Sequence, residues 1–408
     1  MEFLTVDSVE TARQKLLSHI KSGWPKKENV TLDNALGRIL AEDIYSPEDI
    51  PPFRRSTVDG YAVFSADTAA AGESIPALLT VKARVEMGEA ATFEIGRGEC
   101  AEVPTGGMVP DGADAVVMVE YCEPFGGEVA VHCSAAYGEN IVQIGEDAKK
   151  GTLLAKRGRC LLPQDIGALA AVGVTDVSVF AAPRMTVIST GDELVSAEKK
   201  PAIGQVRDIN TRSLTALAQK TGYEVVAAYV APDDEKALEA IICPAMQKSD
   251  IVAVSGGSSQ GAKDMTKAAL DRVSSPGVFT HGLALKPGKP TILGFDDRSG
   301  TILAGLPGHP VSAMVVFELI FGWLLRELTG MGEARHIPAR ISTNVAASPG
   351  KLTCHPAKLH WTGLEYVAEP IFKKSGLITA LTVADGYFAI ECGTEGLRAG
   401  ESVLVHLF

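Results

Sequence analysis

Three glycines, a lysine and an aspartate are grouped in one loop of this 408-residue sequence in an order that suits anion binding. The stretch 255–264 reads SGGSSQGAKD and lies between an apolar run and a helical pattern. Gly256, four residues and Gly261 match the spacing of a Walker A loop, but Ala262-Lys263-Asp264 replace the Lys-Ser/Thr ending. Three interpretations stay open: a damaged nucleotide loop, a plain strand-to-helix turn, or another anion site in which Asp264 replaces the hydroxyl.

Two further loops and one turn have the same polar character. STGDEL (189–194) follows an apolar run and carries Asp192 and Glu193, and GLPGHPVSA (305–313) is a rigid turn before a helical pattern that opens near Ser312. In LKPGKP, Lys286 and Lys289 flank a Pro-Gly turn. Each loop alone has a structural explanation, because strand-to-helix turns favour Gly, Asp and Ser. Together, the lysines, carboxylates and backbone donors suit a phosphorylated or oxyanionic ligand with a divalent cation, and carboxylates favour Mg²⁺ over zinc.

A second group of candidates lies earlier in the chain. Asp59 is in a turn-forming Asp-Gly, Thr105 is at a Gly-Gly corner, and Glu146 and Asp147 lie in GENIVQIGEDAKKG. As isolated turn residues they have a structural explanation. To act with the other loops they must reach them by folding back or across a dimer interface.

The candidate loops can act together only if secondary-structure elements place them at the same edge of a sheet. From residue 183 onward, apolar runs alternate with helical patterns, which predicts a parallel sheet with helices on both faces. Ligands bind such sheets at the carboxyl ends of the strands, where the three loops fall. We predict a multidomain α/β plus β fold with four parts: a helical linker domain (1–50 and 151–180), an inserted β domain (51–150), an α/β domain (181–330) and a C-terminal β domain (331–408). Within the linker domain, short helices are expected near 9–20 and 30–40.

Composition excludes several classes of function. The formal net charge of −12 argues against nucleic acid or an acidic membrane surface as the main partner. The first ten residues lack a signal-peptide pattern, and the seven cysteines form no CxxC pair, which favours a cytoplasmic location. Cys354, His355 and His360 fit no standard zinc spacing, and His309 is read as a hydrogen-bonding side chain. The sequence supports no Ser-His-Asp or Cys-His arrangement for covalent catalysis.

The sequence resembles the molybdopterin molybdenumtransferases, the family of MoeA and the gephyrin E domain. The resemblance runs nearly end to end through STVDGYAV, VPTGGMVPDGADAVVMVE, GEDAKKG, VISTGDEL, GQVRDINTRSL, SGGSSQGAKDMTK, LKPGKP, GLPGHPVSA and KSGLITALTVADGYFAI. It implies a MoeA-like molecule with an elongated helical portion, a β insert, a molybdopterin-binding α/β domain and a C-terminal β-barrel-like domain. The implied reaction inserts molybdate into adenylylated molybdopterin and releases AMP with help from Mg²⁺.

The resemblance also implies site residues and partners. A homodimer would share each active site between the α/β domain of one subunit and the β insert of the other, and the adenylyltransferase and molybdoenzymes would be further partners. The implied metal positions are Glu193 and Asp264. The implied catalytic residues are Asp59, Thr105, Asp147, Glu193, Asp208 and Asp264, and the implied substrate-binding residues are Gly256, Gly257, Ser258, Gly261, Lys286, Lys289, Pro307, Pro310, Ser312 and Ser375.

This sequence departs from the family pattern around the oxyanion. Gly282 stands where a lysine is frequent, His309 stands where asparagine is frequent, and the usual C-terminal arginine is absent, with Lys351 or Lys358 as substitutes. Molybdate and tungstate therefore both remain candidate oxyanions. A scaffold of the same fold that has lost turnover and a CinA-like pyrophosphate hydrolase are the alternative functions.

Overall fold

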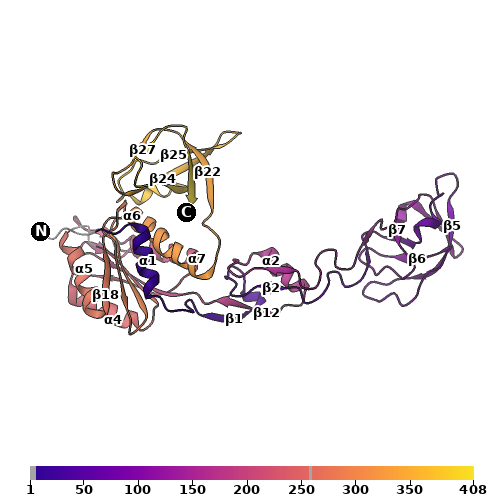
Figure 1. Ribbon diagram of the computed structural model, residues 1–408, viewed down its shortest axis with the longest axis horizontal. Helices are drawn as coiled ribbons and strands as arrows, with labels where there is room; N and C mark the ends of the chain where they lie inside the picture. Colours follow the sequence, from indigo (N-terminus) through magenta and orange to yellow (C-terminus); the bar gives the residue numbers. More distant parts are fainter. Residues whose placement is uncertain (1–5, 257–259) are drawn as a thin grey trace.

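The fold is that of a computed structural model, which describes residues 6–256 and 260–408, with the side chains of 260–264 outside this description. The molecule is elongated (Figure 1). An α/β body and a β barrel lie together at one end, a narrow linker follows, and a separate β domain lies at the far end. No helix among the described residues is long and apolar enough to cross a lipid bilayer.

A six-stranded sheet forms the centre of the α/β body, in the order β16-β13-β17-β21-β20-β18. Strands β16, β13, β17 and β21 are parallel, and β20 runs antiparallel to its neighbours β21 and β18. The bounds are β13 (Arg184–Thr190), β16 (Glu224–Ala231), β17 (Ile251–Gly256), β18 (Pro276–His281), β20 (Ile292–Asp296) and β21 (Thr301–Pro307).

Helices pack on both faces of this sheet because its strands are apolar on both sides. Val187 of β13 faces the core shared with α1, α3 and α6, whereas its neighbour Ile188 faces the core shared with α4 and α5. The predicted long helix after residue 309 contains a π-helical turn, η4 (Glu318–Gly322), between α6 and α7. The helix bounds are α1 (Val9–His19), α3 (Asn210–Thr221), α4 (Glu235–Met246), α5 (Gln260–Val273), α6 (Pro310–Phe317) and α7 (Trp323–Thr329).

The linker is built mainly from short strand pairs. Antiparallel pairs β1 (Lys27–Thr31) with β12 (Asp176–Phe180) and β2 (Ile44–Tyr45) with β11 (Leu153–Ala155) join its two chain segments. One α-helix, α2 (Pro163–Ala171), packs on them. The predicted helix over 30–40 is wrong: Val30 pairs with Val177 in the β1–β12 ladder, and only a 3₁₀ turn, η1 (Leu32–Asn34), follows. Pairing between distant β-branched residues has outweighed the local helical pattern.

The inserted domain is a six-stranded sheet in the order β7-β4-β6-β5-β9-β8 with apolar clusters on both faces. The pair β3 (Arg55–Ser56) and β10 (Ile141–Val142) joins the two chain segments where they enter it. The other bounds are β4 (Gly60–Val63), β5 (Ala77–Arg84), β6 (Glu99–Val103), β7 (Ala115–Met118), β8 (Cys122–Phe125), β9 (Glu128–Val131), η2 (Ser65–Asp67) and η3 (Val119–Tyr121).

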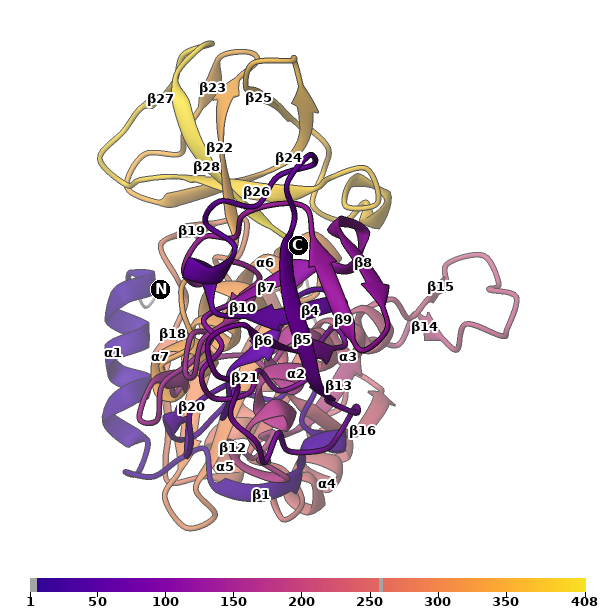
Figure 2. The ribbon, with the colours of Figure 1, turned by 90° about the vertical axis from the view of Figure 1, so that its right-hand side faces the viewer.

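The C-terminal part is a closed five-stranded barrel, seen at the top of Figure 2. Its order is β24-β25-β22-β28-β26, and the pairing of β24 with β26 closes it around a core that includes Phe388. The bounds are β22 (His336–Ile341), β24 (Leu352–Trp361), β25 (Tyr366–Pro370), β26 (Gly386–Ile390) and β28 (Ser402–Leu407), with a side pair β23 (Val345–Ala346) and β27 (Gly396–Leu397) and a 3₁₀ turn η5 (Ile378–Ala380).

The start, middle and end of the chain meet at one segment of the α/β body. The backbone N–H of Asp7 donates to the Gly282 carbonyl at 3.0 Å, and the N–H of Ala284 donates to the Asp7 carbonyl at 2.7 Å. On the other side, β19 (Leu285–Lys286) pairs in parallel with β24 of the barrel. Lys286 is therefore held by elements from all three parts.

Candidate active site

A cavity of about 250 Å³, here called the rim cavity, lies at the carboxyl ends of β13, β17 and β21. The parallel sheet brings these ends to one edge, where ligands of such folds bind. The rim cavity brings together four of the candidate residues, Glu193, Asp208, Gly256 and Pro310. Gly257 and Ser258 lie outside the described residues. Gly261 lies in α5, and the Asp264 side chain is not among those described.

The rim cavity presents buried polar atoms that are free to bind a ligand. The Asn210 amide donates from Nδ2 to Ser255 Oγ and to the Gly308 carbonyl, both at 2.8 Å, and this ties the loops after β17 and β21 to α3. In the described part of the chain, Ser189 Oγ and Asn210 Oδ1 are buried without a hydrogen-bond partner. Burying such atoms is unfavourable unless a ligand or water satisfies them, so this cavity is suited to a ligand with hydrogen-bond donors.

Gly256 ends β17 where the backbone passes close to β13. A Cβ at this position would lie 1.8 Å from Thr190 Oγ1 and 2.8 Å from the Thr190 carbonyl oxygen. Only glycine fits here without moving the neighbouring strand.

We expect Gly256→Ala to lower the local stability of the sheet by about 2–3 kcal/mol, because the added methyl group overpacks against Thr190. Native-state hydrogen exchange of the β13 and β17 amides measures this change. Gly72→Ala is the matched control, since a Cβ there meets no atom within 4 Å. Equal exchange rates in the two variants would contradict the close packing at Gly256.

The carboxylates at the rim have unequal surroundings. Asp208 is only 8% exposed and accepts hydrogen bonds from the backbone N–H of Thr211, at 3.2 Å, and from the Thr211 hydroxyl. It therefore also caps the start of α3. Burial raises the pKa of Asp233, and the Asp192 and Glu193 carboxylates raise it further. The described side chains contain no group of three metal-ligating residues that could hold an ion by themselves.

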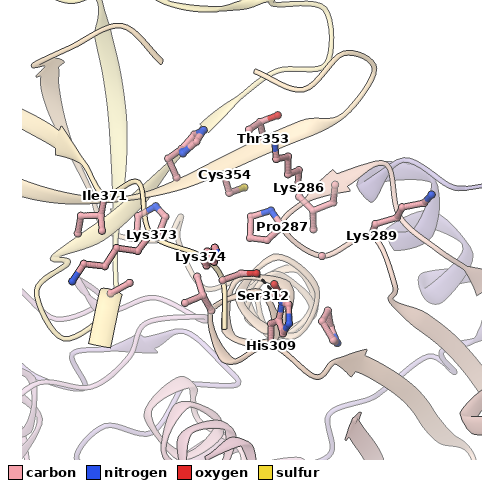
Figure 3. Close-up of a pocket in the computed structure, with 18 of the residues that line it drawn as sticks. Lys286, Pro287, Lys289, His309, Ser312, Thr353, Cys354, Ile371, Lys373 and Lys374 are labelled. Atoms are coloured by element: carbon pink, nitrogen blue, oxygen red, sulfur yellow. Dashed lines mark hydrogen bonds between the residues drawn. The ribbon is translucent and has the colours of Figure 1, made fainter. Parts of the chain in front are cut away.

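A second cavity of about 550 Å³, here called the anion cavity, lies between the α/β body and the barrel (Figure 3). Five lysines line it and no carboxylate among the described residues does, although the chain carries a net charge of −12. Such a cationic cavity attracts and holds a compact anion. The α/β body contributes Lys286, Lys289, Pro307 and Ser312, and the barrel contributes Lys351, Lys373, Lys374 and Ser375.

The environment of the anion cavity also determines the protonation of two of its other side chains, His355 and Cys354. Burial, together with the nearby Lys286 ammonium group, lowers the pKa of His355, and burial raises the pKa of Cys354 to about 12. A neutral histidine and a protonated thiol leave the lysines as the charged groups of the cavity. Of the two lysines considered as arginine substitutes, Lys351 lines the cavity and Lys358 does not.

The two cavities adjoin each other, because Gly308 and His309 line both. His309 contacts the barrel through Ser375, with 2.8 Å between His309 Nδ1 and Ser375 Oγ. A ligand in the rim cavity and an anion in the second cavity would therefore be neighbours.

The insert residues are not brought to these cavities within one chain. Asp59 accepts hydrogen bonds from the Thr105 backbone N–H at 2.7 Å and from the Thr105 hydroxyl at 3.1 Å, so the two residues form one polar corner. That corner belongs to the domain at the far end of the molecule (Figure 1). Asp147 lies on the returning segment, where its backbone N–H donates to the Ile50 carbonyl at 3.0 Å.

Sequence reasoning missed four residues of these cavities, and the sequence held a signal for two of them. Lys373 and Lys374 directly precede Ser375, so a basic pair beside a candidate residue was visible. Asn210 and Ser189 gave no such signal, since an amide near a helix start and a serine in a strand have ordinary structural explanations. His360, one of the residues considered for zinc, lies on the barrel surface with its Nε2 2.9 Å from Glu369 Oε2.

Three family models match successive regions of the chain. Residues 186–327, which contain the sheet and the rim, match a model described as "Probable molybdopterin binding domain". Residues 7–173 match the MoeA N-terminal region (domain I and II), and residues 338–408 match the MoeA C-terminal region (domain IV). The α/β body is thus of the molybdopterin-binding class.

Full-length relatives agree with this assignment. The chain is 32% identical to the molybdopterin molybdenumtransferase of Haemophilus influenzae over 98% of both chains, and 31% identical to that of Staphylococcus aureus over 92% of this chain and 89% of the relative. A solved structure of the molybdopterin biosynthesis MoeA protein of Pyrococcus horikoshii matches with a TM-score of 0.83 and 31% identity over 99% of this chain and 100% of that one. The chain belongs to the MoeA family of molybdopterin molybdenumtransferases.

Proposed function

We propose that this protein is a molybdopterin molybdenumtransferase of molybdenum cofactor biosynthesis. It inserts molybdate into adenylylated molybdopterin and releases AMP. The observation that carries this proposal is the pairing of the lysine-lined anion cavity with the rim cavity across Gly308 and His309. One reaction that joins a compact oxyanion to a larger organic ligand needs two such adjoining cavities.

The groups of the rim cavity suit the pterin substrate. The unpaired Ser189 and Asn210 oxygens can accept hydrogen bonds from N–H groups of the pterin. The glycine loop that begins at Gly256 would hold the terminal phosphate through backbone N–H groups. These contacts orient the substrate so that its reacting end faces the anion cavity.

The groups of the anion cavity suit molybdate, a compact dianion. Lys286 and Lys289 provide ammonium groups on the α/β side, and Ser312 provides a hydroxyl donor near the start of α6. Lys351 on the barrel side supplies a point charge where a planar guanidinium would give a two-pronged contact. Tungstate has the same shape and charge, so the same groups would bind it.

Mg²⁺ fits the acidic side of the rim. The raised pKa of Asp233 reflects burial and the repulsion from Asp192 and Glu193, and a divalent cation would relieve this repulsion. We assign Glu193 and Asp264 as its protein ligands, since Mg²⁺ prefers oxygen donors. When bound, Mg²⁺ would stabilise the negative charge that develops as the phosphoanhydride to AMP breaks.

The insert residues enter this proposal through a homodimer. Asp59, Thr105 and Asp147 of one subunit would complete the site formed by the rim and anion cavities of the other. The distance between the two ends of the molecule supports this arrangement (Figure 1). The linker of short strand pairs would then be a spacer that sets the reach of the insert. We also expect the adenylyltransferase and the acceptor molybdoenzymes to be transient partners.

The proposal is tested by mixing the purified protein with adenylylated molybdopterin, Mg²⁺ and increasing molybdate or tungstate, and measuring released AMP. We expect AMP release that saturates with the oxyanion and stops when Mg²⁺ is chelated. If no AMP is released at any oxyanion concentration, the protein is not this enzyme, and a scaffold that has retained the fold is favoured. Release that does not depend on the oxyanion would instead favour a pyrophosphate hydrolase.

A further inference from the structure

The barrel contacts the α/β body on two sides of the anion cavity, and the two contacts differ in strength. On one side, β19 pairs with β24: Leu285 is opposite Leu352, Lys286 is opposite Thr353, and the N–H of Leu352 donates to the Ala284 carbonyl at 2.9 Å. This side is a continuous backbone ladder that places Lys286 in the wall of the cavity. Cys354 and Tyr387 of the barrel are also buried in the core of the α/β body, so the main body of the barrel is held firmly.

On the other side, a short barrel segment, residues 373–376, contacts the start of α6. The Ser375 hydroxyl shares a hydrogen bond with His309 Nδ1 at 2.8 Å, and the N–H of Val311 donates to the Ser375 carbonyl at 3.2 Å. The next residue, Gly376, lies so close that a Cβ added there would be 3.7 Å from His309 Cδ2. This side therefore depends on one side-chain hydrogen bond and one long backbone hydrogen bond.

His309 is placed at the start of α6 without serving as its cap. It is the N-cap residue of that helix, yet its side chain makes no capping hydrogen bond. The imidazole is directed to Ser375 instead, from the position where the two cavities adjoin. A single hydrogen bond of this kind is weak enough to break thermally and strong enough to change a binding constant several-fold.

We propose that His309 is a positioning residue that latches segment 373–376 of the barrel across the anion cavity. When the latch is closed, Lys373 and Lys374 are among the residues that line the anion cavity. When it opens, segment 373–376 moves away from the start of α6 and the entrance for the anion widens, while Cys354 and Tyr387 keep the rest of the barrel packed in the core of the α/β body. The identity of the anion as molybdate rests on the proposed function, whereas the latch itself does not.

The test measures binding of molybdate alone to the full chain by equilibrium dialysis. We expect His309→Ala and Ser375→Ala each to weaken binding about three- to tenfold, since each removes the same hydrogen bond. The double variant should be no more than about twofold weaker than either single variant, because the two residues act as a pair. His309→Asn should remain within about twofold of the unaltered chain, because the amide group of asparagine occupies the position of Nδ1.

A matched histidine outside the cavity provides the control. His360 also makes one side-chain hydrogen bond, to Glu369 on the barrel, and does not line the anion cavity. His360→Ala should leave molybdate binding unchanged. Hydrogen exchange of the peptide 371–384 should accelerate in His309→Ala and not in His309→Asn or His360→Ala, a result that a general loss of stability would not produce.

The outcomes separate this proposal from the proposed function. Unchanged molybdate binding in His309→Ala, or equal losses in His309→Ala and His309→Asn, would overturn the latch even if the unaltered chain releases AMP. Conversely, the expected pattern of binding in a protein that releases no AMP would support the latch and reject the transferase. Additive losses in the double variant would also overturn the latch, since independent effects cannot come from one shared hydrogen bond.

Discussion

Replacing Lys286 by alanine is expected to lower kcat/KM for molybdate about 100-fold, because a charge-assisted contact to a dianion is lost from the anion cavity. Lys286 lines this cavity, and the pairing of β19 with β24 fixes the backbone from which its ammonium group extends. AMP release as a function of molybdate concentration measures the change. The KM for adenylylated molybdopterin should remain within about twofold, since the defect lies on the oxyanion side.

Lys358→Ala is the matched control for this change. Lys358 lies on β24, is exposed like Lys286, and is outside the anion cavity. Its removal should change activity by less than about twofold. A loss of activity in Lys358→Ala equal to that in Lys286→Ala would show that overall positive charge, and not the anion cavity, governs the reaction.

Mixed dimers of two inactive variants are expected to recover activity. Asp59→Asn inactivates the insert and Lys286→Ala inactivates the anion cavity, so a heterodimer contains one site with both changes and one site with neither. Heterodimers isolated through two different affinity tags should show about half the activity of the unaltered dimer, because one of two symmetric sites is intact. The two parent homodimers should show almost none.

A pair of changes in the same domain serves as the control for mixed dimers. Asp59 and Thr105 form one corner of the insert. A heterodimer of Asp59→Asn and Thr105→Ala chains has an altered insert at every site and should stay inactive. Recovery in this control, or no recovery in the first heterodimer, would mean that the active site is not shared in the proposed way.

The rim could be predicted from the sequence because each of its loops directly follows a strand that is recognisable from neighbouring residues. Each candidate loop follows a buried strand, and parallel strands bring such loops to one edge, so Glu193 and Gly256 were expected together and line one cavity. Asp208, which only the family resemblance implied, lines the same cavity. Lys286, Lys289 and Ser312 were expected to bind the oxyanion and likewise line one cavity. Whether these residues act as assigned stays a prediction until the variants are measured.

The parts that escaped sequence reasoning depend on contacts between distant segments. Nothing local shows that Lys373 and Lys374 of the barrel face Lys286 across a cavity, or that Ser375 contacts His309. Residues 30–40 have a helical pattern, but their partner strand lies almost 150 residues later, as the pairing of Val30 with Val177 shows. Tertiary pairing decides such segments, and a single sequence does not display it.

The meeting of three chain regions around residues 282–286 limits how this protein can be divided. The segment is bounded by Asp7 on one side and by β24 of the barrel on the other. An isolated α/β domain, however well its sheet folded, would lack both neighbours of the strand that carries Lys286. The anion cavity therefore cannot be reproduced by any single module of this protein: its lining comes from both the α/β body and the barrel, and the segment that leads to Lys286 is also hydrogen-bonded to Asp7.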